Sequence, residues 1–194
     1  MKIKQQKQIQ AFLIENFGAE KGTALCNRQK KALRALLKAA GNKPKAQRKT
    51  LMQTILPRIA LYQALSKSFS EDTAYEFLRS YMLDIVAAEK HASMRKMERI
   101  PGFYALYSRI FLRIMRSTDL QESTQKRGRD FFDVTITKCL WHTACVENGC
   151  EKLCRLFCDV DDVTYGGLRK IGFTRTQTLG YGADCCDFHF FRKR

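Results

Sequence analysis

The spacing of apolar residues changes once along this chain, near residue 130. Upstream of it, apolar residues recur every three or four positions, which gathers them on one face of a helix. Downstream, Phe132, Val134 and Ile136 alternate with polar residues, as in a half-buried strand. Helices followed by strands favour an α+β fold over a doubly wound one. We therefore expect N-terminal amphipathic helices packed on a C-terminal lobe with a small antiparallel sheet.

Three helices are expected in the upstream part. One ends at the glycine and proline of residues 41–44. A second begins after Ser70, whose hydroxyl can cap free amides and which two acids follow. The third follows Pro101-Gly102, and we expect it to pack on the second. The apolar residues of the last two helices are Ala74, Phe77, Leu78, Tyr81, Met82, Ile85 and Val86, then Phe103, Leu106, Tyr107, Ile110, Phe111, Ile114 and Met115.

The pattern divides the chain into three segments. Residues 1–118 form a basic helical region, residues 119–130 are polar and predict a connector, and residues 131–194 form a cysteine-rich α+β lobe. We expect the site of any chemistry in this lobe.

Two helices and a hairpin are expected within the lobe after its first strand. Residues 141–157 predict a helix interrupted near Asn148-Gly149, and a short helix is expected at about 160–170. Residues 173–179 and 185–191 predict two strands. The turn-forming residues between them favour an antiparallel hairpin.

Positive charge is concentrated in the upstream part. Residues 1–128 carry 25 lysines and arginines against 10 acids, whereas residues 129–194 carry 10 against 9. Clustered cations suit a polyanionic partner, but no zinc finger, aromatic RNA-binding box or helix-turn-helix pattern accompanies them. We interpret the charge as an exposed basic face and do not expect a nucleic-acid partner.

Seven of the eight cysteines fall in the last 56 residues. The sequence shows no apolar run long enough to cross a membrane and no signal-peptide pattern at residues 1–6. We therefore expect a cytoplasmic protein with reduced thiols and no membrane partner. Cys150, Cys154 and Cys158 recur every four residues, which is more typical of a helix core than of an iron–sulfur site.

Four residues of the lobe are candidates for chemistry. Cys139 follows the first strand, Cys158 precedes Asp161 by three residues, and Cys186 begins the last strand. Alternation places Cys186 on the inward face of that strand, where a thiol suits a nucleophile, a metal ligand or simple packing. His142, three residues after Cys139, can share a helical face with it as a base or a second ligand.

These residues belong to a series of motifs that occur in order. A cysteine follows a strand at Cys139, a Cys-x-x-Asp begins at Cys158, an Arg-Thr-x-Thr begins at Arg175, and residues 182–188 read Gly-x-x-x-Cys-Asp-Phe. The series resembles the L-2-amino-thiazoline-4-carboxylic acid hydrolase family over roughly residues 65–192, whereas residues 1–64 carry no matching motif.

The resemblance implies a bacterial hydrolase that opens a cyclic thiazoline, or a related heterocycle, to a carbamoyl-cysteine. It implies Cys139, Cys158, Asp161 and Cys186 as the catalytic residues. Ring opening requires attack by a thiolate, or by water that a carboxylate or a metal activates. The three thiols are also compatible with a zinc site.

Substrate-binding candidates follow from the same resemblance. They are Arg175, Thr176, Asp187 and His142. Arg175 can pair with a substrate carboxylate or serve as a structural arginine. The alternative function is a non-catalytic sensor domain that binds a small molecule or a metal. The sequence leaves the substrate and the oligomeric state open.

Overall fold

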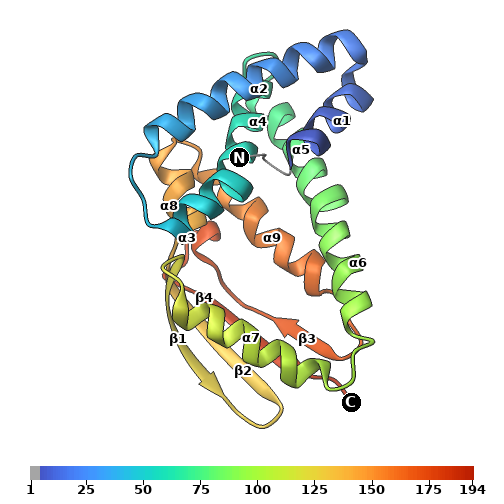
Figure 1. Ribbon diagram of the computed structural model, residues 1–194, viewed down its shortest axis with the longest axis vertical. Coiled ribbons are helices and arrows are strands. Elements are labelled where there is room, and N and C mark those ends of the chain that lie inside the picture. Colours follow the sequence, from blue (N-terminus) through green and yellow to red (C-terminus); the bar gives the residue numbers. More distant parts are fainter. Residues whose placement is uncertain (1–4) are drawn as a thin grey trace. The chain divides into compact units, whose positions relative to one another are not determined.

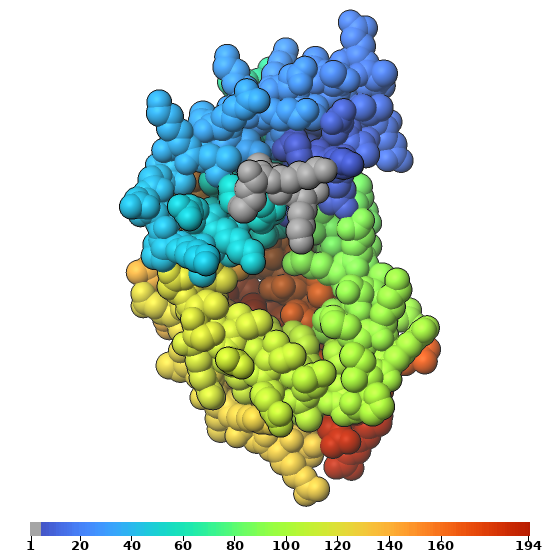
Figure 2. Space-filling view, viewed as in Figure 1, coloured from blue at the N-terminus to red at the C-terminus, as the bar shows by residue number. Residues whose placement is uncertain are grey.

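Residues 5–194 are described by a computed structural model, and the chain divides into two units (Figure 1). The first unit ends at Tyr81 and the second spans Met82–Arg194 (Figure 2). The boundary between the units therefore lies well before residue 118, where the expected helical region ends. The helices that follow Tyr81 belong to the unit that holds the sheet. Across the described residues, no helix has both the length and the apolar character needed to cross a membrane.

The first unit is helical. Its elements are α1 (Gln6–Phe17), α2 (Ala19–Ala39), α3 (Lys45–Thr50), the π-helical segment η1 (Leu51–Ile55), α4 (Leu56–Ser66) and α5 (Glu71–Ser80). Gly22 allows α2 to cross α1 closely, since a Cβ atom at this position would lie 2.6 Å from the Leu13 carbonyl oxygen. The expected helix end at residues 41–44 and the Ser70 cap are confirmed, because Ser70 Oγ accepts a hydrogen bond from the Thr73 amide.

The second unit begins with two helices that Pro101-Gly102 separates, as expected. The π-helical segment η2 (Tyr81–Ala87) leads into α6 (Ala88–Met97), and Gly102 adopts a positive φ of 69° before α7 (Phe103–Ser117). Then come α8 (Leu140–Glu147), the 3-10 turn η3 (Glu151–Leu153) and α9 (Cys154–Tyr165). The expected interruption near Asn148-Gly149 is therefore present, but α9 replaces the short helix expected at about 160–170.

Four antiparallel strands form one sheet in the order β1-β2-β4-β3. They are β1 (Gln121–Arg127), β2 (Phe131–Cys139), β3 (Ile171–Thr174) and β4 (Cys186–Arg192). The 3-10 turn η4 (Leu179–Tyr181) lies between β3 and β4. Helices followed by this sheet confirm the expected α+β class.

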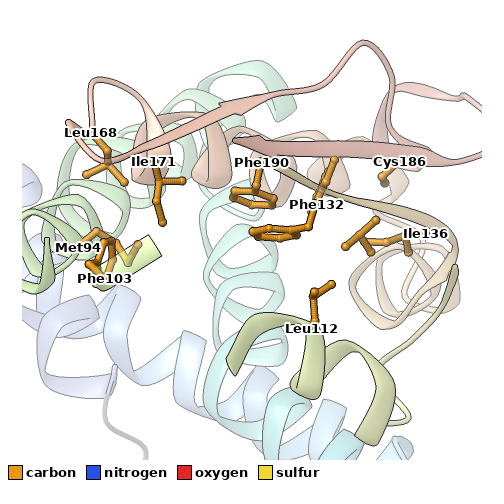
Figure 3. Close-up of a cluster of buried hydrophobic side chains, with 11 residues drawn as sticks. Met94, Phe103, Leu112, Phe132, Ile136, Leu168, Ile171, Cys186 and Phe190 are labelled. Carbon is orange, nitrogen blue, oxygen red and sulfur yellow. The ribbon is translucent and has the colours of Figure 1, made fainter. Parts of the chain in front are cut away.

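Helix α7 packs on the inner face of the sheet (Figure 1). The Phe111 ring of α7 lies 5.0 Å from the Phe190 ring of β4. Phe190 in turn stacks on Phe132 of β2 at 4.8 Å, and Leu112 lies on the α7 side of this pair (Figure 3). The aromatic stripe of α7 meets the aromatic inner face of the sheet, and the two surfaces bury each other.

Two strands differ from their expected bounds. Strand β1 lies inside residues 119–130, which the sequence indicated as a connector. It is an edge strand held by backbone pairing with β2, so it needs no apolar alternation. Strand β3 ends at Thr174, because residues 175–178 leave the sheet and form a loop.

Candidate functional site

The loop at residues 175–178 is held by Asp187, the residue that follows Cys186 on β4. The Asp187 carboxylate accepts hydrogen bonds from the amides of Thr176 and Gln177, each at 2.9 Å, and from the Thr176 hydroxyl. Burial acts to raise the pKa of Asp187, but these hydrogen bonds outweigh it and the pKa is lowered. Thr176 and Asp187, expected to bind substrate, are thus occupied with each other and shape the loop.

Arg175 has an unused hydrogen-bond donor. Its Nη2 donates to Asp162 Oδ2 at 2.5 Å and lies 3.9 Å from Asp159 Oδ1, both on α9. Only 9% of the Arg175 side chain is exposed, and Nη1 is buried with no partner among residues 5–194. A buried guanidinium donor without an acceptor is costly to leave unpaired, which favours an anionic ligand at this atom.

Asp161 on α9 is half-buried, and burial raises its pKa to about 6. The charges of Lys90 on α6 and of Arg175 oppose the rise, while neighbouring Asp162 adds to it. Within the described chain, the Asp161 carboxylate makes no hydrogen bond or ion pair. A carboxyl group with this pKa can exchange a proton near neutral pH.

Two tyrosines lie near Asp161. Tyr107 of α7 donates its hydroxyl hydrogen to the hydroxyl of Tyr165 of α9 at 2.6 Å. Burial is the main cause that raises both pKa values, and the charge of Asp161 raises them further. Both phenols are therefore neutral at physiological pH. Because the Tyr165 oxygen accepts from Tyr107, the Tyr165 hydroxyl can donate its own hydrogen to another acceptor.

The thiols of Cys139, Cys158 and Cys186 influence one another. Burial raises the pKa of Cys139, although the backbone amides of His142 and Trp141 oppose it, and nearby Cys158 raises it further. Burial raises the pKa of Cys186 to about 12, with added contributions from Cys158 and Cys139. The pKa of Cys158 rises mainly through its hydrogen bond with Cys154 and secondarily through burial. All three thiols are protonated at neutral pH.

The expected orientation of Cys186 is confirmed. The residue is 4% exposed and pairs in register with Ile136 of β2, inside the apolar cluster of the sheet (Figure 3). Its sulfur accepts a hydrogen bond from the Leu179 amide at 3.4 Å, which links β4 to η4.

Cysteines of α8 and α9 form a buried row of thiols that ends at Cys158. The Cys150 thiol donates a hydrogen bond to the Cys145 carbonyl oxygen at 3.4 Å, and the thiols of Cys145, Cys154 and Cys158 shift one another's pKa values. All eight cysteines lie among the described residues and are unpaired, and their reduced state in solution stays a prediction. Gly180 of η4 lies against this row, because a Cβ atom there would approach Cys158 Sγ to 2.8 Å. The row is part of the core, as its four-residue spacing indicated.

His142 lies apart from this group. Its Nε2 atom is 3.8 Å from Glu151 Oε1, and only its backbone amide influences Cys139. No group of three or more histidine, cysteine or acidic side chains in the part of the chain that the structure describes is arranged to hold a metal. Zinc binding by Cys139, Cys158 and Cys186 stays a prediction.

The site residues missed by sequence reasoning are Lys90, Tyr107, Tyr165 and Gly180. They lie on α6, α7, α9 and η4, and the two tyrosines carried only the signal of an apolar helix face. Asp161, Cys158 and Tyr165 all belong to α9.

A family model described as L-2-amino-thiazoline-4-carboxylic acid hydrolase matches residues 47–190, which include every candidate residue and extend upstream of residue 65. No curated protein matches the chain.

Solved structures with some similarity are H-NOX proteins. One is from S. oneidensis in the Fe(II)NO ligation state, with 12% identity and a TM-score of 0.31, covering 96% of this chain and 98% of the other. Another is the unliganded Fe(II) protein from K. algicida, with 8% identity and a TM-score of 0.33, covering 100% and 97%. These TM-scores are too low to support an argument about this chain.

Proposed function

Because the chain belongs to the L-2-amino-thiazoline-4-carboxylic acid hydrolase family, we propose that it is a hydrolase that opens a 2-amino-thiazoline-4-carboxylate ring or a closely related heterocycle. The substrate combines a carboxylate with an amidine-like carbon between sulfur and nitrogen. An enzyme for it needs a cation for the carboxylate and a base that activates water.

The proposed reaction adds one water and breaks one ring bond. Water attacks the carbon between sulfur and nitrogen and gives a tetrahedral intermediate. The bond from this carbon to the ring sulfur then breaks, the carbon becomes the carbonyl of a carbamoyl group, and the sulfur leaves as a thiol. Both protons of the water leave its oxygen: one ends on the ring nitrogen, whose double bond to the carbon becomes a single bond, and the other ends on the departing sulfur. A single acid/base group can accept a proton from the attacking water and return it to the sulfur.

Asp161 is the proposed acid/base group. With a pKa of about 6 it is mostly ionised at pH 7, yet basic enough to take a proton from attacking water. An ordinary surface aspartate, with a pKa near 3.9, is a weaker base by about two units. The protonated form of Asp161 then supplies the proton that the departing sulfur requires.

The thiols are proposed to line the site in neutral form. Nucleophilic attack by cysteine requires a thiolate, and burial raises the pKa values of Cys139 and Cys186. Three neutral sulfur atoms provide an apolar, polarizable wall that suits a sulfur-containing ring. Water activated by Asp161 is therefore favoured over direct thiolate attack.

The observation that carries the proposal is the unpartnered Nη1 atom of Arg175. The guanidinium is fixed by Asp162 through its other terminal nitrogen, so Nη1 has a defined direction. Arg175 also acts electrostatically on Asp161 and Cys158, which indicates that donor and base serve the same site. A substrate carboxylate at Nη1 satisfies the buried donor and brings the ring to Asp161.

The test is turnover of 2-amino-thiazoline-4-carboxylate by purified protein, with the product identified by mass spectrometry as substrate plus one water. Asp161→Asn is expected to lower kcat by a factor of roughly 10² to 10⁴, the usual contribution of a general base. Asp184→Asn, an exposed aspartate outside the site, is the matched control and should retain activity.

A second pair of variants tests Arg175. Arg175→Lys keeps the charge but loses the fork of donors, so we expect KM to rise about tenfold with a smaller change in kcat. Arg155→Lys changes an exposed arginine of α9 that lies over the Tyr181 ring, and it should leave KM unchanged. Saturable binding of the substrate without product would refute hydrolysis and support the sensor alternative.

A further inference from the structure

A second cavity lies at one end of the sheet and shares no residue with the site described above. It has a volume of about 980 Å³ and is lined by residues 102–105, 129–130 and 191–194 and by Lys170. These segments are the start of α7, the turn between β1 and β2 and the end of β4, whereas Lys170 immediately precedes β3. Small-molecule pockets span about 300–1,000 Å³, so this cavity has room for a ligand with two parts.

The cations of the lobe are concentrated in this cavity. Residues 129–194 contain ten lysines and arginines and nine acids. Five of these ten cations line the cavity, namely Arg129, Lys170, Arg192, Lys193 and Arg194, but Asp130 is the one acid among the lining residues. In a segment that is nearly neutral, this uneven placement creates a local positive field that favours an anion.

The acid does not neutralise the cavity. Asp130 Oδ1 lies 3.7 Å from Arg192 Nη1, so it offsets one cation of the five. The first turn of α7 adds backbone to the rim but no acidic side chain. Four cations therefore remain without a carboxylate among the lining residues, which is enough for a doubly charged group.

Aromatic rings form the apolar part of the cavity. Tyr104 and Phe191 line it and are both half-buried. The Phe191 ring packs directly on the backbone of Gly172, where a Cβ atom would approach the ring to 2.1 Å. An aromatic ring beside a cation cluster suits a ligand that joins a planar group to an anionic group.

We propose that this cavity binds a phosphate monoester whose planar group packs on Tyr104 or Phe191. The dianionic phosphate takes its hydrogen bonds from Arg129, Lys170 and Arg194, which Asp130 does not pair with. This binding is separate from the proposed hydrolysis and does not depend on it, because the two sites have different residues.

The test uses calorimetric titration of the whole protein with adenosine monophosphate, inorganic phosphate and adenosine as probes. Adenosine monophosphate is expected to bind more tightly than phosphate, and adenosine should not bind. Lys170→Ala should weaken binding roughly tenfold or more, the usual effect of losing one charge-assisted hydrogen bond. Arg169→Ala is the matched control, since it removes the same charge from the adjacent residue, which does not line the cavity.

Both variants are expected to fold, because Arg169 and Lys170 are exposed and Glu98 binds only their backbone amides. Equal weakening by both variants would refute a defined site and indicate nonspecific attraction to a basic protein. Equal affinity for phosphate and adenosine monophosphate would refute the role of the rings. Preference for a single-stranded oligonucleotide over the monophosphate, with a steep salt dependence, would assign the surface to nucleic acid instead.

Discussion

Replacing Asp161 with asparagine separates the cost of burying this carboxylate from its role in catalysis. Asparagine resembles the protonated acid in size and polarity but never ionises. The pKa of Asp161 is about 6 in the folded protein and 3.8 in the unfolded chain. The folded protein therefore prefers the protonated form, and ionisation destabilises it.

The magnitude follows from the pKa difference. A shift of about two units corresponds to about 3 kcal/mol at 1.36 kcal/mol per unit. Solvent reaches part of the side chain, which makes this figure an upper value. The destabilisation is absent below pH 4, grows between pH 4 and pH 6, and is complete above pH 6. We thus expect Asp161→Asn to match the wild type at pH 4 and to exceed its stability by about 1–3 kcal/mol at pH 8.

The assay is urea unfolding of both proteins at several pH values from 4 to 8, alongside turnover. Asp187→Asn is the control with the opposite sign. Because hydrogen bonds lower the pKa of Asp187, its charge stabilises the fold above pH 4 and this contribution is lost as the pH falls. Its variant should be less stable than the wild type at pH 8. The compared quantity is the free energy of unfolding of Asp161→Asn minus that of the wild type. If this difference is lower at pH 8 than at pH 4, the burial argument is refuted.

Three other changes test the surrounding structure. Cys186→Ala should cost about 1 kcal/mol of stability and leave kcat nearly unchanged, because the buried thiol is proposed to pack and not to react. A loss of kcat by orders of magnitude in a folded variant would instead support Cys186 as a nucleophile. Gly180→Ala should destabilise the protein by roughly 1–3 kcal/mol, since its methyl group would meet Cys158 Sγ at 2.8 Å and the Cys154 backbone at 3.0 Å; an unchanged melting temperature would show that η4 moves easily. Elemental analysis of the purified protein checks the zinc prediction, and one equivalent of zinc that Cys139→Ser abolishes would support it.

The sequence predicted best those elements that bury one face in the core and leave the other face exposed. The alternation of Phe132, Val134 and Ile136 identified β2, because this strand is paired on both sides and has one face in the core. The polar residues of β1 gave no such signal, since backbone hydrogen bonds alone hold an edge strand.

The sequence named Arg175, Thr176 and Asp187 as candidates but gave no sign of the contacts that they make with their neighbours. The threonines after Arg175 alternate as in a strand, yet Asp187 captures the amides of Thr176 and Gln177 and turns the chain into a loop. The alternation of residues within this segment cannot reveal that a carboxylate ten residues away binds the backbone amides that a strand partner would otherwise bind. Tyr107 and Tyr165 were hidden for a related reason, because their rings lie in the core while their hydroxyls meet each other.

The way Asp187 holds this loop determines which substitutions it tolerates. Thr176 contributes a side-chain donor, so serine is the natural replacement there, whereas valine removes the hydroxyl. Gln177 is bound to Asp187 through its backbone amide, so the size and polarity of its side chain matter little to this contact. Proline is the exception at position 177, because it has no amide hydrogen to donate. Sequence drift at this position is therefore compatible with an intact loop, and an apparently variable residue can remain part of a fixed structure.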